Sequence, residues 1–362
     1  MKSILGSNIR LARLLHGLSL ADLGERLGKS KQYLSRIETG AEQVSATLER
    51  DLVDELGVLP AFFRHLDPMP ITEEQCHFRK QLTTKVALRQ YARARGELLK
   101  RLVCVLDRHL ELPSYNILET EPTSEEAIER GAERCRSLWG LGYGPISNIT
   151  RIAENAGAVV MRVNGLAAEV DAVSFATQRP VIALNGQGKS ACRARFGIAH
   201  ELGHFALHTG VLTGDRLTET QANRFASALL LPRSSFLAES HRVLRRSRLN
   251  WEGISELKIR WGVSKAALLY RGKQLGVFSD DQMRSGYITL KRHGEAIEEN
   301  EDSLIPQETP EIVSEGIQVL SEQLSIPIAA VSREMHVQPK LLNDLLGISE
   351  TNSTTNVVNL FN

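Results

Sequence analysis

Apolar residues in the first sixty positions recur every three or four residues, and short turns rich in glycine and serine interrupt them. This spacing is typical of amphipathic helices, which bury one face. Ser19 and Ser30 stand where helix N-caps are expected, whereas Gly28 and Gly40 suit helix ends. The pattern predicts four short helices with a tight turn between the second and third, at residues 4–16, 20–27, 31–38 and 45–56.

Beyond residue 66, longer helical patterns alternate with short apolar runs. A basic, leucine-rich stretch predicts a long helix at residues 85–112. A short apolar run at 181–184, bounded by Pro180 and by Asn185-Gly186, predicts a strand. Apolar residues at helical spacing predict two further helices, around 196–207 and 217–230.

The chain changes character after residue 290. Residues 295–315 carry eight acidic side chains and no lysine or arginine, which predicts a linker or a mobile segment. The polar end, residues 349–356, is expected to fray. Between them, helical patterns without a basic face lie at 312–324, 327–335 and 340–346.

Composition limits the class of protein. With 362 residues, 42% of them hydrophobic, the chain exceeds one ordinary core and predicts two or three domains. No apolar run is long enough to span a membrane, the N-terminus lacks a signal-peptide pattern, and the four cysteines stand far apart. These features predict a cytoplasmic protein with reduced thiols and no membrane association.

Charge is polarised within the first sixty residues. Residues 1–36 hold seven basic and two acidic side chains, a net charge of +5. Residues 37–60 hold one basic and six acidic side chains, a net charge of −5. The segment is neutral overall, but DNA phosphates would meet its basic half.

The run from Leu18 to Gly40 resembles the Cro/repressor-type (XRE) helix-turn-helix domain, and the similarity spans residues 4–58. In such domains the N-terminal part of the second motif helix reads bases in the major groove. The resemblance implies binding to a double-stranded DNA operator. The residues it nominates for DNA contact are Ser30, Lys31, Gln32, Tyr33 and Arg36. Helix packing is an equal alternative role for Tyr33.

The run HELGH at residues 200–204 points to chemistry. Two histidines four apart lie on one face of a helix, so His200 and His204 can hold one Zn²⁺. Glu201 lies beside the first histidine and can take a proton from a water at the metal. The alternative is a helix with two packed or solvated histidines.

The third ligand decides the type of site. A third histidine of the HExxHxxGxxH kind is excluded, because Leu207 and Gly210 stand where glycine and histidine are required. Glu219, on the following helix, is therefore the expected third ligand. Asn223 shares its face and can accept the ring N–H of a ligating histidine. His208 is not expected to be a ligand, since three ligands from one straight helix would strain a tetrahedral site. We expect it either to contact a ligating residue from behind or to pack in the core.

These runs together resemble the ImmA/IrrE family of zinc metallopeptidases, which are of gluzincin type, over roughly residues 120–290. The matching segments are FGIAHELGHFALH at 196–208, ExxANxFA at 219–226 and LLP at 230–232. The resemblance implies an α+β peptidase domain with a small sheet, in which Glu201 also passes the proton to the leaving amine. An edge strand beside the metal pairs with the substrate in such enzymes, and 181–184 is either that strand or a purely structural one.

Together the patterns predict a multidomain, mainly α protein. The expected parts are an all-α helix-turn-helix domain (1–66), a helical linker (67–120), an α+β gluzincin-like metallopeptidase domain (121–292), and an acidic linker with a small helical C-terminal region (293–362). We expect a DNA-binding regulator that binds its operator as a homodimer. We also expect it to make a zinc-dependent cut in a repressor-type protein or in itself. The alternative is a transcription regulator or antitoxin without proteolysis, whose zinc fold senses a ligand or stress.

Overall fold

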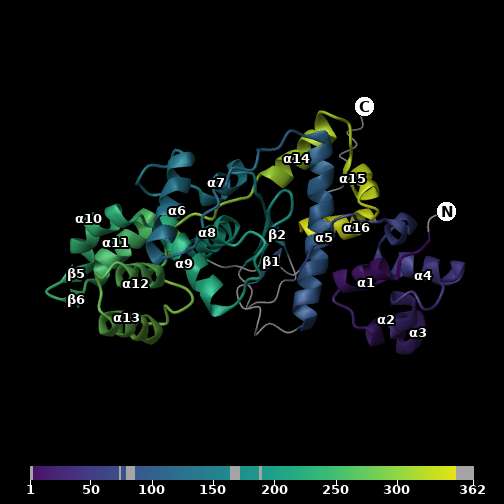
Figure 1. Ribbon diagram of the computed structural model, residues 1–362, viewed down its shortest axis with the longest axis horizontal. Coiled ribbons are helices and arrows are strands. Elements are labelled where there is room, and N and C mark those ends of the chain that lie inside the picture. The colour runs from purple at the N-terminus through teal and green to yellow at the C-terminus, as the bar shows by residue number, and fades with distance from the viewer. Residues whose placement is uncertain (1–2, 73–74, 79–85, 164–171, 187–189, 348–362) are drawn as a thin grey trace, which may run out of the picture.

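The computed structural model describes residues 3–72, 75–78, 86–163, 172–186 and 190–347 (Figure 1). The end that was expected to fray lies outside these residues. Most of the described chain is helical, and a small four-stranded sheet lies near the middle of the molecule.

The N-terminal bundle has the helices that the sequence predicts, with small differences at the ends. They are α1 (Gly6–Leu15), α2 (Leu20–Leu27), α3 (Lys31–Glu38) and α4 (Ala46–Leu56), followed by a 3-10 turn, η1 (Pro60–Arg64). Ser19 and Asp22 form the capping box of α2, and the Ser30 hydroxyl accepts the N–H of Tyr33 at 3.2 Å to cap α3. Gly28 ends α2 with a φ of 62°, a left-handed conformation that favours glycine. The turn between α2 and α3 is therefore fixed locally.

The central sheet separates two hydrophobic cores. Its strand order is β1-β3-β4-β2, in which β2 and β4 are parallel and the other pairs are antiparallel. Because side chains alternate across a strand, one face of the sheet packs on α5 (Val86–His109) and the other on α8 (Ala191–Leu207). The strands are β1 (Cys76–Phe78), β2 (Val159–Val163), β3 (Ala172–Phe175) and β4 (Val181–Asn185).

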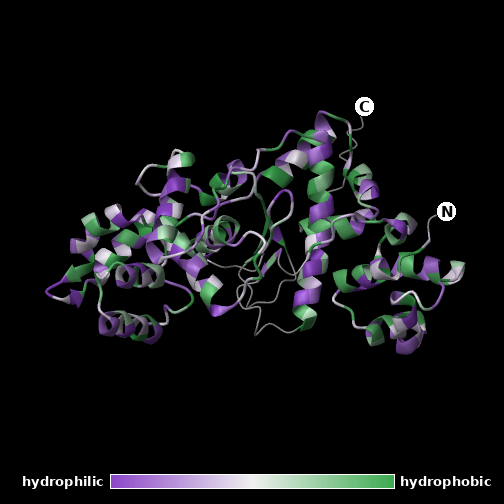
Figure 2. Cartoon of the chain, viewed as in Figure 1, coloured by the Kyte–Doolittle hydropathy of each residue, from purple (hydrophilic) through white to green (hydrophobic). Residues whose placement is uncertain are grey.

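β4 lies inside the sheet, between β3 and β2, so of the two roles left open for residues 181–184 the structural one applies and the edge-strand role does not. The sequence patterns predict neither β1 nor β3. α5 approaches the sheet closely because Gly96 has no side chain: a Cβ there would lie 2.5 Å from the ring of Phe175. Along its length α5 mixes hydrophobic and hydrophilic residues (Figure 2), and its leucine stripe is buried within this chain.

Helices on the far side of the sheet complete the second core. Residues 244–249 form a two-stranded hairpin, β5 (Leu244–Arg245) and β6 (Arg248–Leu249). The helices are α6 (Glu125–Leu138), α7 (Ile149–Asn155), α9 (Arg216–Leu230), α10 (Arg233–Val243), α11 (Trp251–Trp261), α12 (Lys265–Gln274) and α13 (Asp280–Arg292).

The acidic segment, predicted to be a linker or mobile, is instead packed against this second core. Lys258 on α11 is fully buried and contacts Glu299 and Asp302 at 2.5 Å each. Lys265 on α12 contacts Glu295 at 2.6 Å. The acidic side chains thus neutralise lysines that lie far away in the sequence, which local composition does not reveal. A short 3-10 turn, η2 (Asp302–Leu304), lies within the segment.

The C-terminal helices return to the N-terminal bundle. α14 (Ile312–Glu322), α15 (Ile328–Glu334) and α16 (Pro339–Leu346) pack around α5 and β2. The backbone of this region is hydrogen-bonded to the end of α4, from the N–H of Leu59 to His336 (2.9 Å) and from the N–H of Gln338 to Gly57 (2.8 Å). One continuous hydrophobic core therefore joins the N-terminal bundle, α5, one face of the sheet and the C-terminal helices.

Candidate functional site

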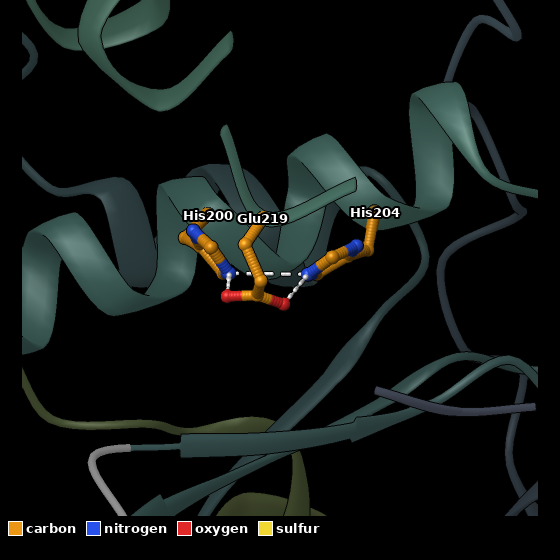
Figure 3. A group of neighbouring side chains, drawn as sticks. All are labelled: His200, His204 and Glu219. Carbon is orange, nitrogen blue, oxygen red and sulfur yellow. Dashed lines mark hydrogen bonds and ion pairs between the residues drawn. The ribbon is translucent and has the colours of Figure 1, made fainter. Parts of the chain in front are cut away.

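Three of the predicted residues converge between α8 and α9. The Nε2 atoms of His200 and His204 lie 3.0 Å apart on one face of α8. Glu219, in the first turn of α9, directs one carboxylate oxygen at each histidine, and both N–O distances are 3.4 Å (Figure 3). Both histidine side chains are almost fully buried, and that of Glu219 is 14% exposed.

Close packing of the two helices brings Glu219 this near. Gly203, between the histidines, faces α9: a Cβ there would lie 3.2 Å from the carbonyl oxygen of Ala222. Small residues at both positions allow the two backbones to approach. The carboxylate of Asp215 begins α9 by accepting the N–H of Leu217 at 2.7 Å.

The far ring nitrogen of His200 contacts Asn223. Its Nδ1 lies 3.0 Å from the Asn223 side-chain oxygen. Because an amide oxygen only accepts, this Nδ1 carries the proton and Nε2 presents a lone pair to the site. The arrangement is the one expected of Asn223 from its position on α9.

A longer chain of hydrogen bonds orients His204. Gln221 donates its amide N–H to the carbonyl of Pro122 (3.3 Å), which leaves its Oε1 facing Nε2 of His208 at 2.9 Å. His208 Nε2 therefore carries the proton, and its Nδ1 accepts from Nδ1 of His204 at 3.0 Å. His204 Nε2 is left as a lone pair. Two imidazole lone pairs and a carboxylate thus face one another with no proton between them.

Glu201 lies on the sheet side of α8. It is 2% exposed, and its Oε2 accepts a hydrogen bond from the hydroxyl of Ser174 on β3. Ser174 is itself fully buried, and sequence reasoning missed it. A polar residue inside an apolar run was the available signal.

The nominated DNA-contact residues fall around the start of α3. Lys31, Gln32 and Arg36 are exposed. Tyr33 is half-buried and packs against the bundle core, and Ser30 is engaged as the N-cap. A buried ion pair of 2.6 Å between Arg13 and Glu38 ties α3 to α1. The bundle therefore presents a short exposed stretch of polar side chains at the N-terminus of a rigidly held helix.

Comparison with protein families assigns both regions. Residues 9–63 match the helix-turn-helix family model, and residues 153–273 match the peptidase M78 model, described as the IrrE N-terminal-like domain. The chain joins a helix-turn-helix domain to an IrrE N-terminal-like domain. No curated protein matches the chain. The first match indicates DNA binding, and the second indicates a metallopeptidase-like domain of a family that is generally metal-dependent.

The donor set of the IrrE-like domain fits a metal ion. Nitrogen and oxygen ligands of a tetrahedral zinc, each about 2.0–2.1 Å from the ion, lie about 3.3 Å apart; the separations here are 3.0, 3.4 and 3.4 Å. Glu219 Oε1 is buried and accepts no hydrogen bond from the described residues. Among the described residues, His200, His204 and Glu219 form a potential metal-ligand group. Their ligand atoms all lie within 4.8 Å of one another.

The electrostatics of the IrrE-like site favour the forms that a metal needs. Burial lowers the pKa of His204 to about 4, so its ring is neutral at neutral pH. Burial raises the pKa of Glu219, but the facing rings of His200 and His204 outweigh this and lower the pKa to about 2. The carboxylate is therefore ionised. Cation binding would replace proton binding at these groups.

A second missed residue, His77 on β1, covers the site. Its ring stacks on His204 with centroids 4.8 Å apart and an interplanar angle of 7°. Nδ1 lies 2.7 Å from the Thr213 hydroxyl, whereas Nε2 is buried without a hydrogen-bond partner among the described residues. No local sequence signal marks His77, because only strand pairing brings it here.

No helix of the described chain is long and apolar enough to cross a membrane.

Proposed function

We propose that this protein is a DNA-binding regulator whose IrrE-like domain is a zinc endopeptidase. The observation that carries the proposal is the set of three proton-free donors with Glu201 beside them. His200, His204 and Glu219 would hold Zn²⁺, which when bound would polarise a peptide carbonyl and activate water. Asn223 and His208 would keep the two rings in the metal-binding tautomer.

Glu201 supplies the proton transfer in this proposal. Its carboxylate would take a proton from the attacking water and deliver it to the leaving amine nitrogen. The Ser174 hydroxyl holds one carboxylate oxygen in place. Because Glu201 is buried, bulk water is largely excluded from the group that moves the proton. A fold that only bound a ligand would have no use for this carboxylate.

The helix-turn-helix domain would place the peptidase on DNA. Lys31, Gln32 and Arg36 are exposed at the start of α3 and are the residues we propose to contact the operator, with Ser30 and Tyr33 setting the helix. We propose two copies per operator, since such domains read paired half-sites. The substrate would be a repressor of the helix-turn-helix class or the chain itself, within the cytoplasm.

The test compares wild type with Glu201→Gln, both loaded with zinc. Each is incubated alone and with a helix-turn-helix repressor, and products are identified by mass spectrometry. The expected result is cleavage by wild type alone, at equal zinc stoichiometry in both proteins. His204→Ala should lose the zinc. If neither protein yields products while both bind the same operator, the regulator acts without proteolysis and the peptidase proposal is wrong.

A further inference from the structure

A cavity of about 590 Å³ lies between α1 and α5, away from the metal site. Its volume falls in the range of small-molecule sites, which occur preferentially between domains. Apolar side chains form part of the wall, among them Leu11, Leu14 and Pro70. Four arginines form much of the rest: Arg10, Arg89, Arg93 and Arg101.

The two carboxylates in the wall offset only part of the charge of these arginines. Asp67 contacts Lys100 at 2.6 Å, and Glu97 contacts the same lysine at 2.9 Å while accepting the N–H of Ile71 at 2.6 Å. Among the residues that the structure describes, no ion pair or hydrogen bond engages any of the four arginines. Four cations against two carboxylates leave an excess of two positive charges in the wall.

The burial of Arg101 indicates that the cavity is a formed binding site and not a solvated surface. This residue is 8% exposed, and its Nε and Nη1 are buried with no hydrogen-bond partner among the described residues. The guanidinium stacks over the ring of Phe62, 4.2 Å from its centroid. Leaving a buried guanidinium with unmet donors is unfavourable, and an anion in the cavity would satisfy them.

We propose that this cavity binds a small organic anion with a phosphate or carboxylate group and an apolar body. The two excess charges suit a dianion, and guanidinium forks bind both groups bidentately. Since α1 belongs to the helix-turn-helix bundle and α5 to the sheet core, the ligand would bridge the two and set how firmly they dock. DNA phosphates are the competing partner for Arg10, Arg89 and Arg93, but a duplex cannot reach Arg101.

The probe is anilinonaphthalene sulfonate, an apolar anion that fluoresces on binding, titrated into the full chain without DNA. Wild type should show one saturable site, displaced by adenosine monophosphate if phosphate is recognised or by citrate if carboxylate is. Arg93→Gln should weaken binding about tenfold, while the matched control Arg95→Gln, on the same helix but outside the cavity wall, should not. Arg101→Gln should act likewise if it folds.

Equal affinity of Arg93→Gln and wild type would overturn the proposal. So would a loss confined to DNA, in which Arg93→Gln lowers the salt-dependent affinity for a duplex and leaves probe binding intact.

A separate observation concerns β1 and rests on the proposed peptidase function. β1 pairs antiparallel with β3 in a register that sets His77 opposite Ser174. Paired residues lie on the same face of a sheet, and this face meets α8: Ser174 contacts Glu201 and His77 stacks on His204. Without β1, the sheet would end at β3, directly beside the metal ligands.

An exposed strand edge binds extended peptides by adding them to the sheet. We infer that β1 occupies the edge where a peptide substrate would pair, so the chain in this form is inhibited by its own segment. Within the part of the chain that the structure describes, β1 has three residues, and few ladder hydrogen bonds there oppose its release. It follows the N-terminal bundle by only eleven residues, from the end of η1 at Arg64 to Cys76, so a shift of the bundle would pull on it.

A reversible lock tests this inference. Cys76 and Phe175 are partners across β1 and β3. The next pair, Gln75 and Ala176, shares a ladder hydrogen bond of 2.8 Å, so Cys76 and residue 175 form the pair whose side chains lie closer. Phe175→Cys would allow a disulfide that fixes β1 in place. The same variant, reduced, is its own control.

Two readouts separate this inference from the peptidase proposal. Oxidation should slow zinc transfer to the chelator pyridylazoresorcinol at least fivefold and abolish repressor cleavage, and reduction should restore both. His77→Gly, which weakens β1 without a new cysteine, should speed zinc transfer. Equal cleavage by locked and reduced protein would overturn the inference and leave the peptidase intact. A zinc response without cleavage in either state would instead overturn the peptidase proposal alone.

Discussion

The hydrogen-bond chain behind His204 leads to a quantitative prediction about zinc affinity. His208→Phe nearly keeps the shape of the ring, but the Nδ1–H of His204 loses the acceptor that lies 3.0 Å away. The loss is felt in a buried environment, since His208 is 2% exposed. The tautomer with the proton on Nε2, which cannot bind metal, then competes. One hydrogen bond contributes about 1–1.5 kcal/mol, and partners behind ligating histidines typically change metal affinity 10–100-fold. We expect zinc to bind His208→Phe about tenfold more weakly.

The assay is competition for zinc against a chelator of known affinity at constant pH. His208→Gln offers an amide oxygen to the same N–H and should recover most of the loss. Asn223→Ala acts on the other histidine in the same way and should also weaken zinc binding about tenfold. Thr220→Val, on α9 where the hydroxyl donates to the Arg216 carbonyl of the same helix, should bind zinc as wild type does. Wild-type affinity in a folded His208→Phe would refute the tautomer argument.

Three other predictions follow from buried charge and from the exposed helix. Lys258→Met leaves two carboxylates without their cation around a fully buried position and should lower the unfolding free energy by about 3 kcal/mol or more in denaturant titration. Lys273→Met, at a partly exposed surface ion pair with Asp280, should change it by less than about 0.5 kcal/mol. Burial raises the pKa of Glu154 to about 7 from an ordinary 4.5; the folded chain then binds more protons than the unfolded chain between these values, so the melting temperature should fall as pH rises from about 4.5 to 7, and Glu154→Gln should flatten that slope. Gln32→Ala should weaken operator binding about tenfold or more without moving the melting temperature, and unchanged affinity would remove it from the DNA interface.

The parts that sequence alone could predict are those set by nearby residues. The helices of the N-terminal bundle follow from serine caps and glycine stops, whose hydrogen bonds span three or four positions. The proximity of His200, His204 and Glu219 also follows from helical spacing and from one short loop between the two helices. In each case few chain conformations satisfy the local pattern, so the inference from sequence is tight.

What could not be predicted depends on contacts distant in the sequence. His77 reaches His204 only because a three-residue strand pairs with β3, almost a hundred residues later. Glu299 is buried because it forms an ion pair with Lys258 on α11, a helix about forty residues earlier in the chain. Acidic composition signals only that these side chains need water or a cation, and does not say which one they find. The basic face of α5 is ambiguous in the same way, since its arginines could meet solvent, DNA or a bound anion.

The hydrogen bonds that tie the end of α4 to the C-terminal helices bear on what self-cleavage could achieve. A cut between residues 65 and 75 would break the covalent link from the helix-turn-helix domain to the sheet. The domain would nevertheless stay in place, because Leu59 and Gln338 still share hydrogen bonds with the opposite segment and the two sides share one hydrophobic core. A cleaved molecule would thus behave as a two-chain complex that remains bound to the operator. Dissociation from DNA would require a second event that separates the C-terminal helices from the helix-turn-helix domain.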